Sequence, residues 1–251
     1  TYWGGRILKK TNYKYLNIKG AVLDNYQLEQ YMEKIATSHD VELTSNIATY
    51  PIPRLKDNYR FIEKTYDLLN KHIKMGINLY PAGEWLLDNF YIIEETFKTV
   101  CKEMTITKYK KLPGITTGMY KGFSRIYVVA SEIVAYTDNK INDEILSMAI
   151  SAYQRRKTLA MEEIWNLWIF LEIAIIENIR NICEKIYSSQ VQKYKVESII
   201  ERLVEKKEAN TQVFKPIKDE YKENVSYKEM KYPFIEYMSY RLKQYGKKAY
   251  P

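Results

Sequence analysis

The chain has 251 residues, of which 46% are hydrophobic and 28% charged, the composition of an ordinary globular protein rather than a disordered or fibrous one. Two cysteines, Cys101 and Cys183, exclude a disulfide scaffold, and two histidines, His39 and His72, argue against a zinc site and most His-based acid–base chemistry. The net charge is +8, and residues 185–251 hold 15 basic and 9 acidic residues, so most of the excess lies in the last quarter.

The first half of the chain predicts three helices and a long loop. Asp24 is suited to cap a helix that ends at about Ser38. Apolar residues at helical spacing predict a second helix over about 55–74 and a third from Pro81 to about Met104. The Pro- and Gly-containing segment 105–122 is predicted to be a loop.

The second half is also helical in pattern. Helices are predicted at about 124–137 and 142–156, joined by a short turn at Asp138–Asn139. Thr158 is expected to cap a long helix ending near Tyr187, with Glu162 in a capping-box-like position. That helix is apolar on nearly every face, which predicts a buried central position.

The last part of the chain is also predicted to be helical, so the predicted fold class is all-α. Residues 189–208 form a charged amphipathic segment, and a last helix is expected at Pro233–Tyr245, ending at Gly246. We therefore predict a multi-helix bundle around the long apolar helix. An extended segment at 1–20 would precede a single domain at 21–251, with a compact core at about 21–187 and a more basic helical part at 188–251.

No segment is predicted to span a membrane. The longest charge-free piece of the apolar helix, Ile164–Leu171, is far shorter than the ~20 residues that a bilayer requires. The chain starts at Thr1 without a leader sequence, and we expect a soluble fragment of a longer protein.

Candidate catalytic or structural polar residues lie in three helices. Glu84 and Asp88 share one helical face, and their spacing resembles that of the carboxyl groups of a retaining glycosidase. Both project from one side, however, so a buried structural network is the favoured interpretation. An arginine on an apolar helix usually has a carboxylate partner, which Glu84 or Glu163 could supply to Arg125, and anion binding is a secondary alternative. The predicted network comprises Glu84, Asp88, Arg125, Glu163, Glu177, Asn178 and Arg180.

Three tryptophans are candidates for stacking on a sugar ring, namely Trp85, Trp165 and Trp168. Aromatic residues at helical spacing are more often core residues, and we favour that interpretation for the Trp165/Trp168 pair. The sequence has no phosphate-binding Gly loop, nucleophile elbow, metal motif or dinucleotide fingerprint. We therefore expect no catalytic residue, no metal and no cofactor.

Collinear sequence motifs resemble the N-terminal part of the cyclic β-1,2-glucan synthases. Residues 81–95 read PAGEWLLDNFYIIEE, and the resemblance continues through 123–127 (FSRIY), 163–165 (EIW) and 176–180 (IENIR). It covers residues 55–185 clearly and the flanks loosely. Three residues depart from the family pattern: Ser124 stands for a proline, Thr96 for a glutamine and Glu172 for a basic residue.

The resemblance implies a fragment of a large, multi-domain membrane glucosyltransferase that uses UDP-glucose. Its transferase residues lie elsewhere in the parent, so we expect a non-catalytic helical domain with a scaffold, regulatory or glucan-holding role. The expected location is the cytoplasmic face of the membrane. Expected partners are the remaining domains of the parent synthase and β-glucan, with no nucleic acid and with membrane contact only through the parent.

Two alternative functions remain open. The first is a carbohydrate-active helical enzyme that uses Glu84, Asp88 or Glu163. The second is a peripheral module that binds anionic lipid or another protein through the basic C-terminal part.

Overall fold

The computed structural model describes residues 16, 18, 21–43, 47–208 and 232–249, so most of the predicted segment 1–20 lies outside the described residues. In the described part of the chain the backbone is predominantly α-helical. Its sheet consists of two antiparallel strands of two residues each, β1 (Val41–Glu42) and β2 (Gly114–Ile115). The predicted all-α class is therefore confirmed.

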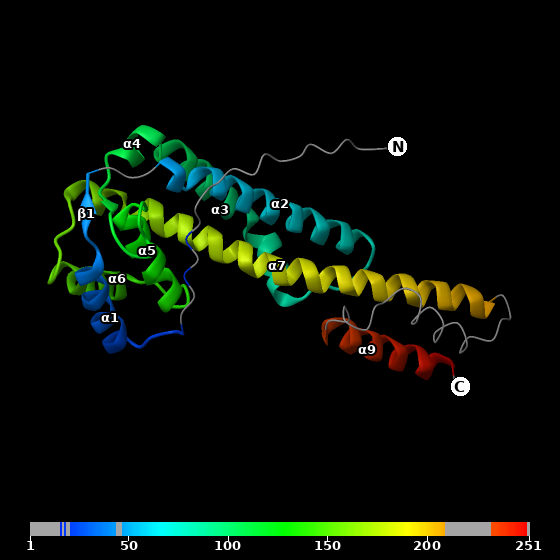
Figure 1. Cartoon of the computed structure of the whole chain (residues 1–251). Helices are drawn as coiled ribbons and strands as arrows, with labels where there is room; N and C mark the ends of the chain where they lie inside the picture. Colours follow the sequence, from blue (N-terminus) through cyan, green and yellow to red (C-terminus); the bar gives the residue numbers. More distant parts are fainter. Residues whose placement is uncertain (1–15, 17, 19–20, 44–46, 209–231, 250–251) are drawn as a thin grey trace. The chain divides into compact units, whose positions relative to one another are not determined.

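The chain forms two compact units, each built from two stretches of the sequence. Unit 1 comprises residues 1–60 and 92–179, and unit 2 comprises residues 61–91 and 180–251. Three long helices contribute residues to both units (Figure 1): α2 (Ile52–Lys74), α3 (Pro81–Glu103) and α7 (Met161–Glu208).

Two capped helices pack together in unit 1. Helix α1 (Asn25–Ser38) lies along α6 (Asp143–Gln154) (Figure 1). The predicted Asp24 cap is confirmed, because its carboxylate accepts from the Gln27 N–H at 2.8 Å while the Gln27 side chain accepts from the Asp24 N–H at 3.2 Å. Asn142 caps α6 in the same way by accepting from the Ile145 N–H at 2.8 Å. Both helix starts are thus fixed by local sequence.

Helix α5 (Arg125–Tyr136) of unit 1 is buried over most of its length. Every residue from 125 to 134 is buried, including the charged side chains of Arg125 and Glu132. The predicted turn after α5 is present, with Asp138 (φ 52°) and Asn139 (φ 61°) both in the left-handed region that these residue types tolerate.

The segment 105–122 is more ordered than the predicted loop. It contains α4 (Ile106–Lys110), whose N-cap is Thr105, and β2, which pairs with β1. The hydroxyl of Tyr109 is buried, donates to the Thr49 carbonyl at 3.1 Å and accepts from the Ser124 N–H at 3.2 Å. This side chain ties the segment to the 3₁₀ turn η1 (Ile47–Thr49) and to the start of α5.

Three predicted helix boundaries are wrong. Helix α7 begins at Met161 rather than after Thr158, and it runs without a break through the predicted boundary near Tyr187 to Glu208. Glu163, not Glu162, satisfies the first turn, because its carboxylate accepts from the Ala160 N–H at 2.8 Å. Helix α9 (Tyr232–Ala249) continues past Gly246, where a helical glycine costs only about 1 kcal/mol.

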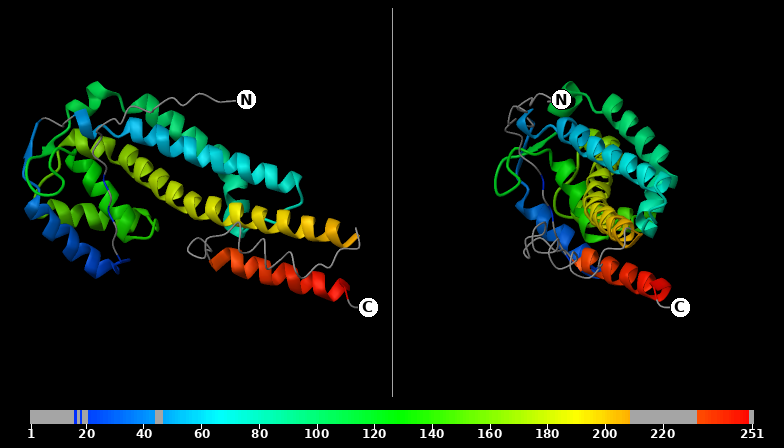
Figure 2. Two further views of the ribbon diagram at one scale, coloured as in Figure 1. Left: turned by 45° about the vertical axis from the view of Figure 1, so that its right-hand side comes forward. Right: turned by 90° about the vertical axis from the view of Figure 1, so that its right-hand side faces the viewer.

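Unit 2 has its own apolar core, which joins the C-terminal half of α7 to α9. The two helices lie side by side in Figures 1 and 2. Gly76 has a φ of 70°, a left-handed conformation suited to glycine, and it follows the end of α2 as predicted. The α7–α9 core consists of Val196, Ile200, Phe234 and Met238, with Ile199, Tyr237 and Leu242 packed against them.

Candidate functional site

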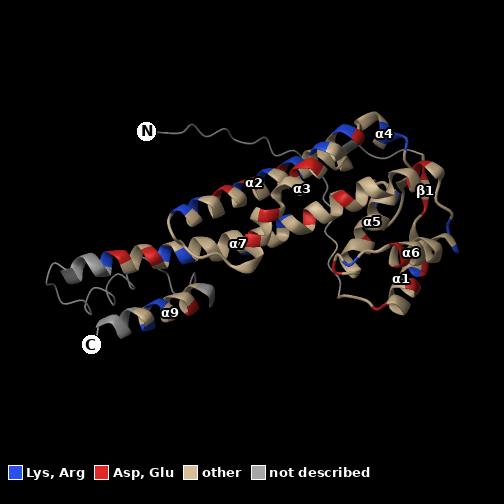
Figure 3. Ribbon diagram, turned by 180° about the vertical axis from the view of Figure 1, so that it is seen from behind, with Lys and Arg blue, Asp and Glu red and all other residues tan. Residues whose placement is uncertain are grey.

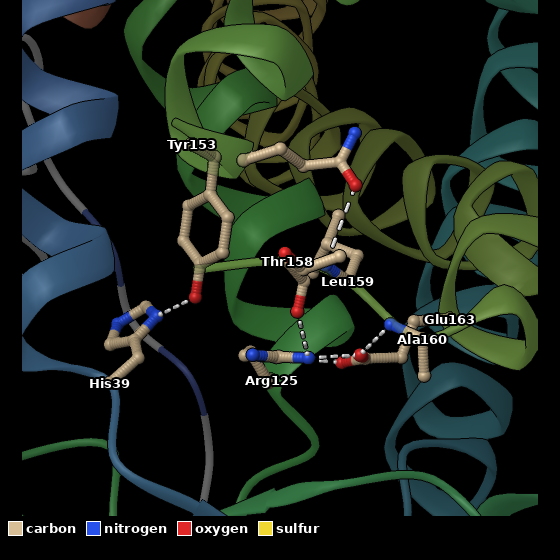
Figure 4. A network of polar contacts seen from close by, with 8 residues as sticks. His39, Arg125, Tyr153, Thr158, Leu159, Ala160 and Glu163 are labelled. Atoms are coloured by element: carbon tan, nitrogen blue, oxygen red, sulfur yellow. Dashed lines mark hydrogen bonds and ion pairs between the residues drawn. The ribbon is translucent and has the colours of Figure 1, made fainter. Parts of the chain in front are cut away.

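A buried ion pair joins α5 to α7 in unit 1 (Figure 4). Arg125 is 4% exposed and Glu163 is fully buried. Arg125 Nε donates to Glu163 Oε1 at 2.9 Å, and Arg125 Nη2 pairs with Glu163 Oε2. This two-point contact is the strong, orientation-specific form of the arginine–carboxylate pair. Of the predicted partners of Arg125, the structure therefore selects Glu163 and not Glu84.

The ion pair also fixes the chain between α6 and α7. Arg125 Nη2 donates to the Thr158 carbonyl at 3.1 Å, and Glu163 Oε2 accepts from the Ala160 N–H at 2.8 Å. The Leu159 N–H reaches the side chain of Gln154 at 3.4 Å. Both charged groups are therefore occupied by structural contacts.

A buried histidine lies beside this pair. His39 is 2% exposed, and its Nδ1 lies 2.9 Å from the hydroxyl of Tyr153 (Figure 4). Burial, together with the positive charges of Arg125 and Lys157, lowers the pKa of His39 to about 4. His39 is therefore neutral at physiological pH, a role that the sequence analysis missed.

A second buried carboxylate was also missed. Glu132 is fully buried on α5 and accepts hydrogen bonds from Tyr31 Oη at 2.9 Å and Tyr120 Oη at 2.6 Å. Burial raises the pKa of Glu132, although the two tyrosine hydrogen bonds lower it. The available signal was a single glutamate within the apolar run of α5, which requires a hydrogen-bond donor from elsewhere.

The other residues of the predicted network have separate partners. Glu177 pairs with Arg54 of α2, and Asn178 Nδ2 donates to Asn139 Oδ1 at 2.8 Å. Arg180 pairs with Glu184 one turn along α7 at 2.8 Å. Glu84 and Asp88 are both exposed on α3. The structure thus brings Arg125 and Glu163 together and distributes the remaining residues over other contacts.

The three candidate tryptophans are exposed, so the core interpretation of the Trp165/Trp168 pair is wrong. Trp165 is 66% exposed, Trp168 44% and, on α3, Trp85 52%. Trp165, Trp168 and Glu172 recur at i, i+3 and i+7, which places them on one face of α7. We call these three residues the tryptophan face. The prediction that α7 is buried on nearly every side is therefore wrong along the tryptophan face.

Glu172 has an unusual environment for a carboxylate. Its Oε2 atom is buried and has no hydrogen-bond partner among the described residues. Burial raises the pKa of this carboxyl group. An unpaired buried oxygen is costly in the folded chain, and its burial favours the protonated form of the carboxyl group.

Acidic and basic side chains are interspersed on the described C-terminal part of the chain. Blue and red residues follow one another along the later half of α7 in Figure 3. Arg241 of α9 pairs with Glu197 of α7 at 2.8 Å. Among the described residues no cluster of three or more His, Cys, Asp or Glu is arranged to hold a metal ion.

Comparison with known proteins relates this chain to one curated protein. No protein-family model matches the sequence. The chain is 26% identical over 151 residues to the cyclic beta-(1,2)-glucan synthase NdvB of Rhizobium meliloti (strain 1021). The aligned stretch is 60% of this chain but only 5% of that synthase. The predicted relationship to this class of synthase is confirmed. None of the helices in the described ranges is long and apolar enough to cross a membrane.

Proposed function

We propose that this chain is a non-catalytic helical element of a glucan synthase that holds the glucan against the tryptophan face of α7. The relationship to the cyclic beta-(1,2)-glucan synthase NdvB supports the link to glucan synthesis. The observation that carries the holding role is the exposure of Trp165 and Trp168 on one face of α7. The remaining domains of the synthase are the proposed partners and would supply any membrane contact.

The tryptophan face has the chemistry that a sugar chain requires. A pyranose ring presents an apolar C–H face that packs on an aromatic ring, and its hydroxyl groups donate hydrogen bonds at the rim. Trp165 and Trp168 offer two rings about one helical turn apart, and the half-buried side chain of Glu172 lies one further turn along α7. Such a pairing of apolar surface with a few placed polar groups is typical of ligand sites.

The positions of the carboxylates support a non-catalytic role. Glycoside cleavage uses two carboxyl groups that flank the scissile bond. Glu163 is fully buried and occupied by Arg125, so it is withdrawn from any substrate. Glu84 and Asp88 project from a single exposed helix face, whereas cleavage requires carboxyl groups on both sides of the bond.

Calorimetric titration with linear and cyclic β-1,2-glucans tests the proposal. We expect saturable binding to the intact chain and loss of at least about tenfold in affinity for the double variant Trp165→Ala/Trp168→Ala, because two stacking rings are removed. Ile182→Ala is the matched control, since Ile182 is a 45% exposed aliphatic residue on the same helix but well beyond the tryptophan face. Glu172→Gln should weaken binding less, because an amide oxygen can still accept.

Two outcomes would contradict the proposal. Unchanged glucan affinity in the double tryptophan variant would remove α7 as the holding surface. Glucan cleavage or transfer by the chain, abolished by Glu84→Gln or Asp88→Asn, would contradict the non-catalytic role.

A further inference from the structure

Unit 2 contains a polar cavity that lies apart from the tryptophan face in sequence. It has a volume of about 170 Å³ and lies between the later part of α7, α9 and the turn after α2. An engineered cavity of ~150 Å³ accommodates one benzene ring, so this cavity has room for a single six-membered ring. Typical drug-sized sites are larger, at ~300–1,000 Å³.

Aromatic rings form part of the lining. Tyr194 of α7 is 41% exposed and Tyr240 of α9 is 54% exposed, so both rings are available to a ligand. Tyr237 lies deeper, and its ring stacks at 6.2 Å and 28° with that of Tyr240. Exposed tyrosines in a concave site combine an apolar ring face with a hydroxyl at its edge.

The polar groups of the cavity are held in place by one another. Arg241 Nη2 donates to Glu197 Oε2 at 2.8 Å, and Arg241 Nη1 donates to Gln244 Oε1 at 3.1 Å. Gln244 Nε2 in turn donates to the hydroxyl of Tyr240 at 2.6 Å. The hydroxyl of Tyr237 donates to Glu197 Oε1. This chain of contacts pre-orders acceptors and donors before any ligand arrives, which lowers the cost of binding.

The charged residues that line the cavity indicate which class of ligand it can bind. Glu197 and Glu201 contribute two carboxylates against the single guanidinium of Arg241, so the lining is net negative and disfavours an anion. Two carboxylates, one of them already paired, are too few to enclose a divalent cation, which takes six or more oxygen ligands. A neutral ring rich in hydroxyl groups satisfies both the tyrosine rings and the fixed polar groups.

We infer that this cavity binds one hexose unit, with the ring against Tyr194 and Tyr240 and its hydroxyl groups on Glu197, Arg241 and Gln244. The choice of glucose among hexoses rests on the proposed function. The site is separate from the tryptophan face, so the two can be tested independently.

Titration of the intact chain with sophorose, the β-1,2-linked glucose disaccharide, tests this inference by calorimetry and by saturation-transfer NMR. We expect binding that weakens at least about tenfold in Tyr240→Ala and also falls in Gln244→Ala. Tyr240→Phe retains the ring and should bind more tightly than Tyr240→Ala. Tyr91→Ala is the matched control, because Tyr91 is a 66% exposed tyrosine of unit 2 outside the cavity lining. Unchanged melting temperatures of the variants confirm that each is folded.

The outcomes separate this inference from the proposed function. Sophorose binding that is lost in Tyr240→Ala but retained in Trp165→Ala/Trp168→Ala supports the cavity. The inference is overturned if sophorose shows no saturable binding, or if binding is lost only in the tryptophan variant. Unchanged affinity in both Tyr240→Ala and Gln244→Ala would overturn it as well. Tighter binding of inorganic phosphate than of sophorose would also overturn it.

Discussion

Replacement of Arg125 by methionine should lower the free energy of unfolding by about 3–5 kcal/mol. The variant leaves the fully buried carboxylate of Glu163 without its counter-charge and leaves the Thr158 carbonyl without its donor. Methionine fills much of the same volume, so the loss reports the charge rather than a large cavity. For a chain of this length the loss corresponds to a fall in melting temperature of about 2–4 °C per kcal/mol.

Urea denaturation followed by circular dichroism measures the effect of this substitution. Arg60→Met is the matched control, because the Arg60–Asp57 pair is exposed and should contribute less than about 1 kcal/mol. The double variant Arg125→Met/Glu163→Leu should recover much of the lost stability, since it removes both buried charges. An Arg125→Met variant as stable as the unmodified chain would show that the ion pair does not brace α5 against α7.

Local signals explain why much of the helical architecture was predictable. Asp24 and Gln27 form a capping box with neighbouring backbone groups, and Pro81 occupies the first position of α3. The left-handed turn at Asp138 and Asn139 requires residue types that the sequence supplies at that point. Each of these features depends on residues a few positions apart, so the sequence alone contains the information.

Tertiary context explains the helix boundaries that were predicted wrongly. Gly246 normally favours a helix end, but α9 continues through it to Ala249. Thr158 is a favourable N-cap residue, yet its carbonyl accepts from Arg125 and α7 starts at Met161. In the segment 105–122, the buried hydroxyl of Tyr109 contacts η1 and the start of α5, and no local pattern in the sequence reveals these long-range contacts.

Burial of α7 was mispredicted because apolar composition does not determine which face is covered. α5 is shorter, and it is the helix whose residues 125–134 are all buried. The longer α7 leaves Trp165 and Trp168 exposed. This exposed tryptophan pair on an otherwise apolar helix is the feature on which the proposed glucan-holding role rests.

The pairs of polar side chains could be predicted only in part, because the two partners of a pair can lie far apart in the sequence. Arg125 on an apolar helix required a carboxylate, and the short list of candidates included Glu163. The tyrosine partners of Glu132 came from Tyr31 and Tyr120, and nothing in the spacing identifies them. Arg54 was likewise absent from the predicted network, although it pairs with Glu177 across more than a hundred residues.

Acidification from pH 7 to pH 4 should destabilise the chain through His39. Its pKa is about 4 in the folded state and about 6.5 in an unfolded chain, so between these values the unfolded state binds more protons. The free energy of unfolding therefore falls as the pH is lowered through this window. The lost stability is about 3 kcal/mol by pH 4, because each unit of pKa difference is worth about 1.4 kcal/mol.

Urea denaturation at a series of pH values, for the unmodified chain and for His39→Gln, isolates this contribution. Glutamine can keep a hydrogen bond to Tyr153 but does not titrate, so the stability difference between the two proteins should change by about 3 kcal/mol in favour of the variant on acidification. The raised pKa of Glu132 acts in the opposite direction in both proteins and cancels in the difference. Arg125 and Lys157 are the positive charges that act on His39 in the folded chain. A stability difference that stays constant from pH 7 to pH 4 would contradict this prediction. It would mean that His39 has the same pKa in the folded and unfolded states, so that its burial beside Arg125 does not disfavour protonation.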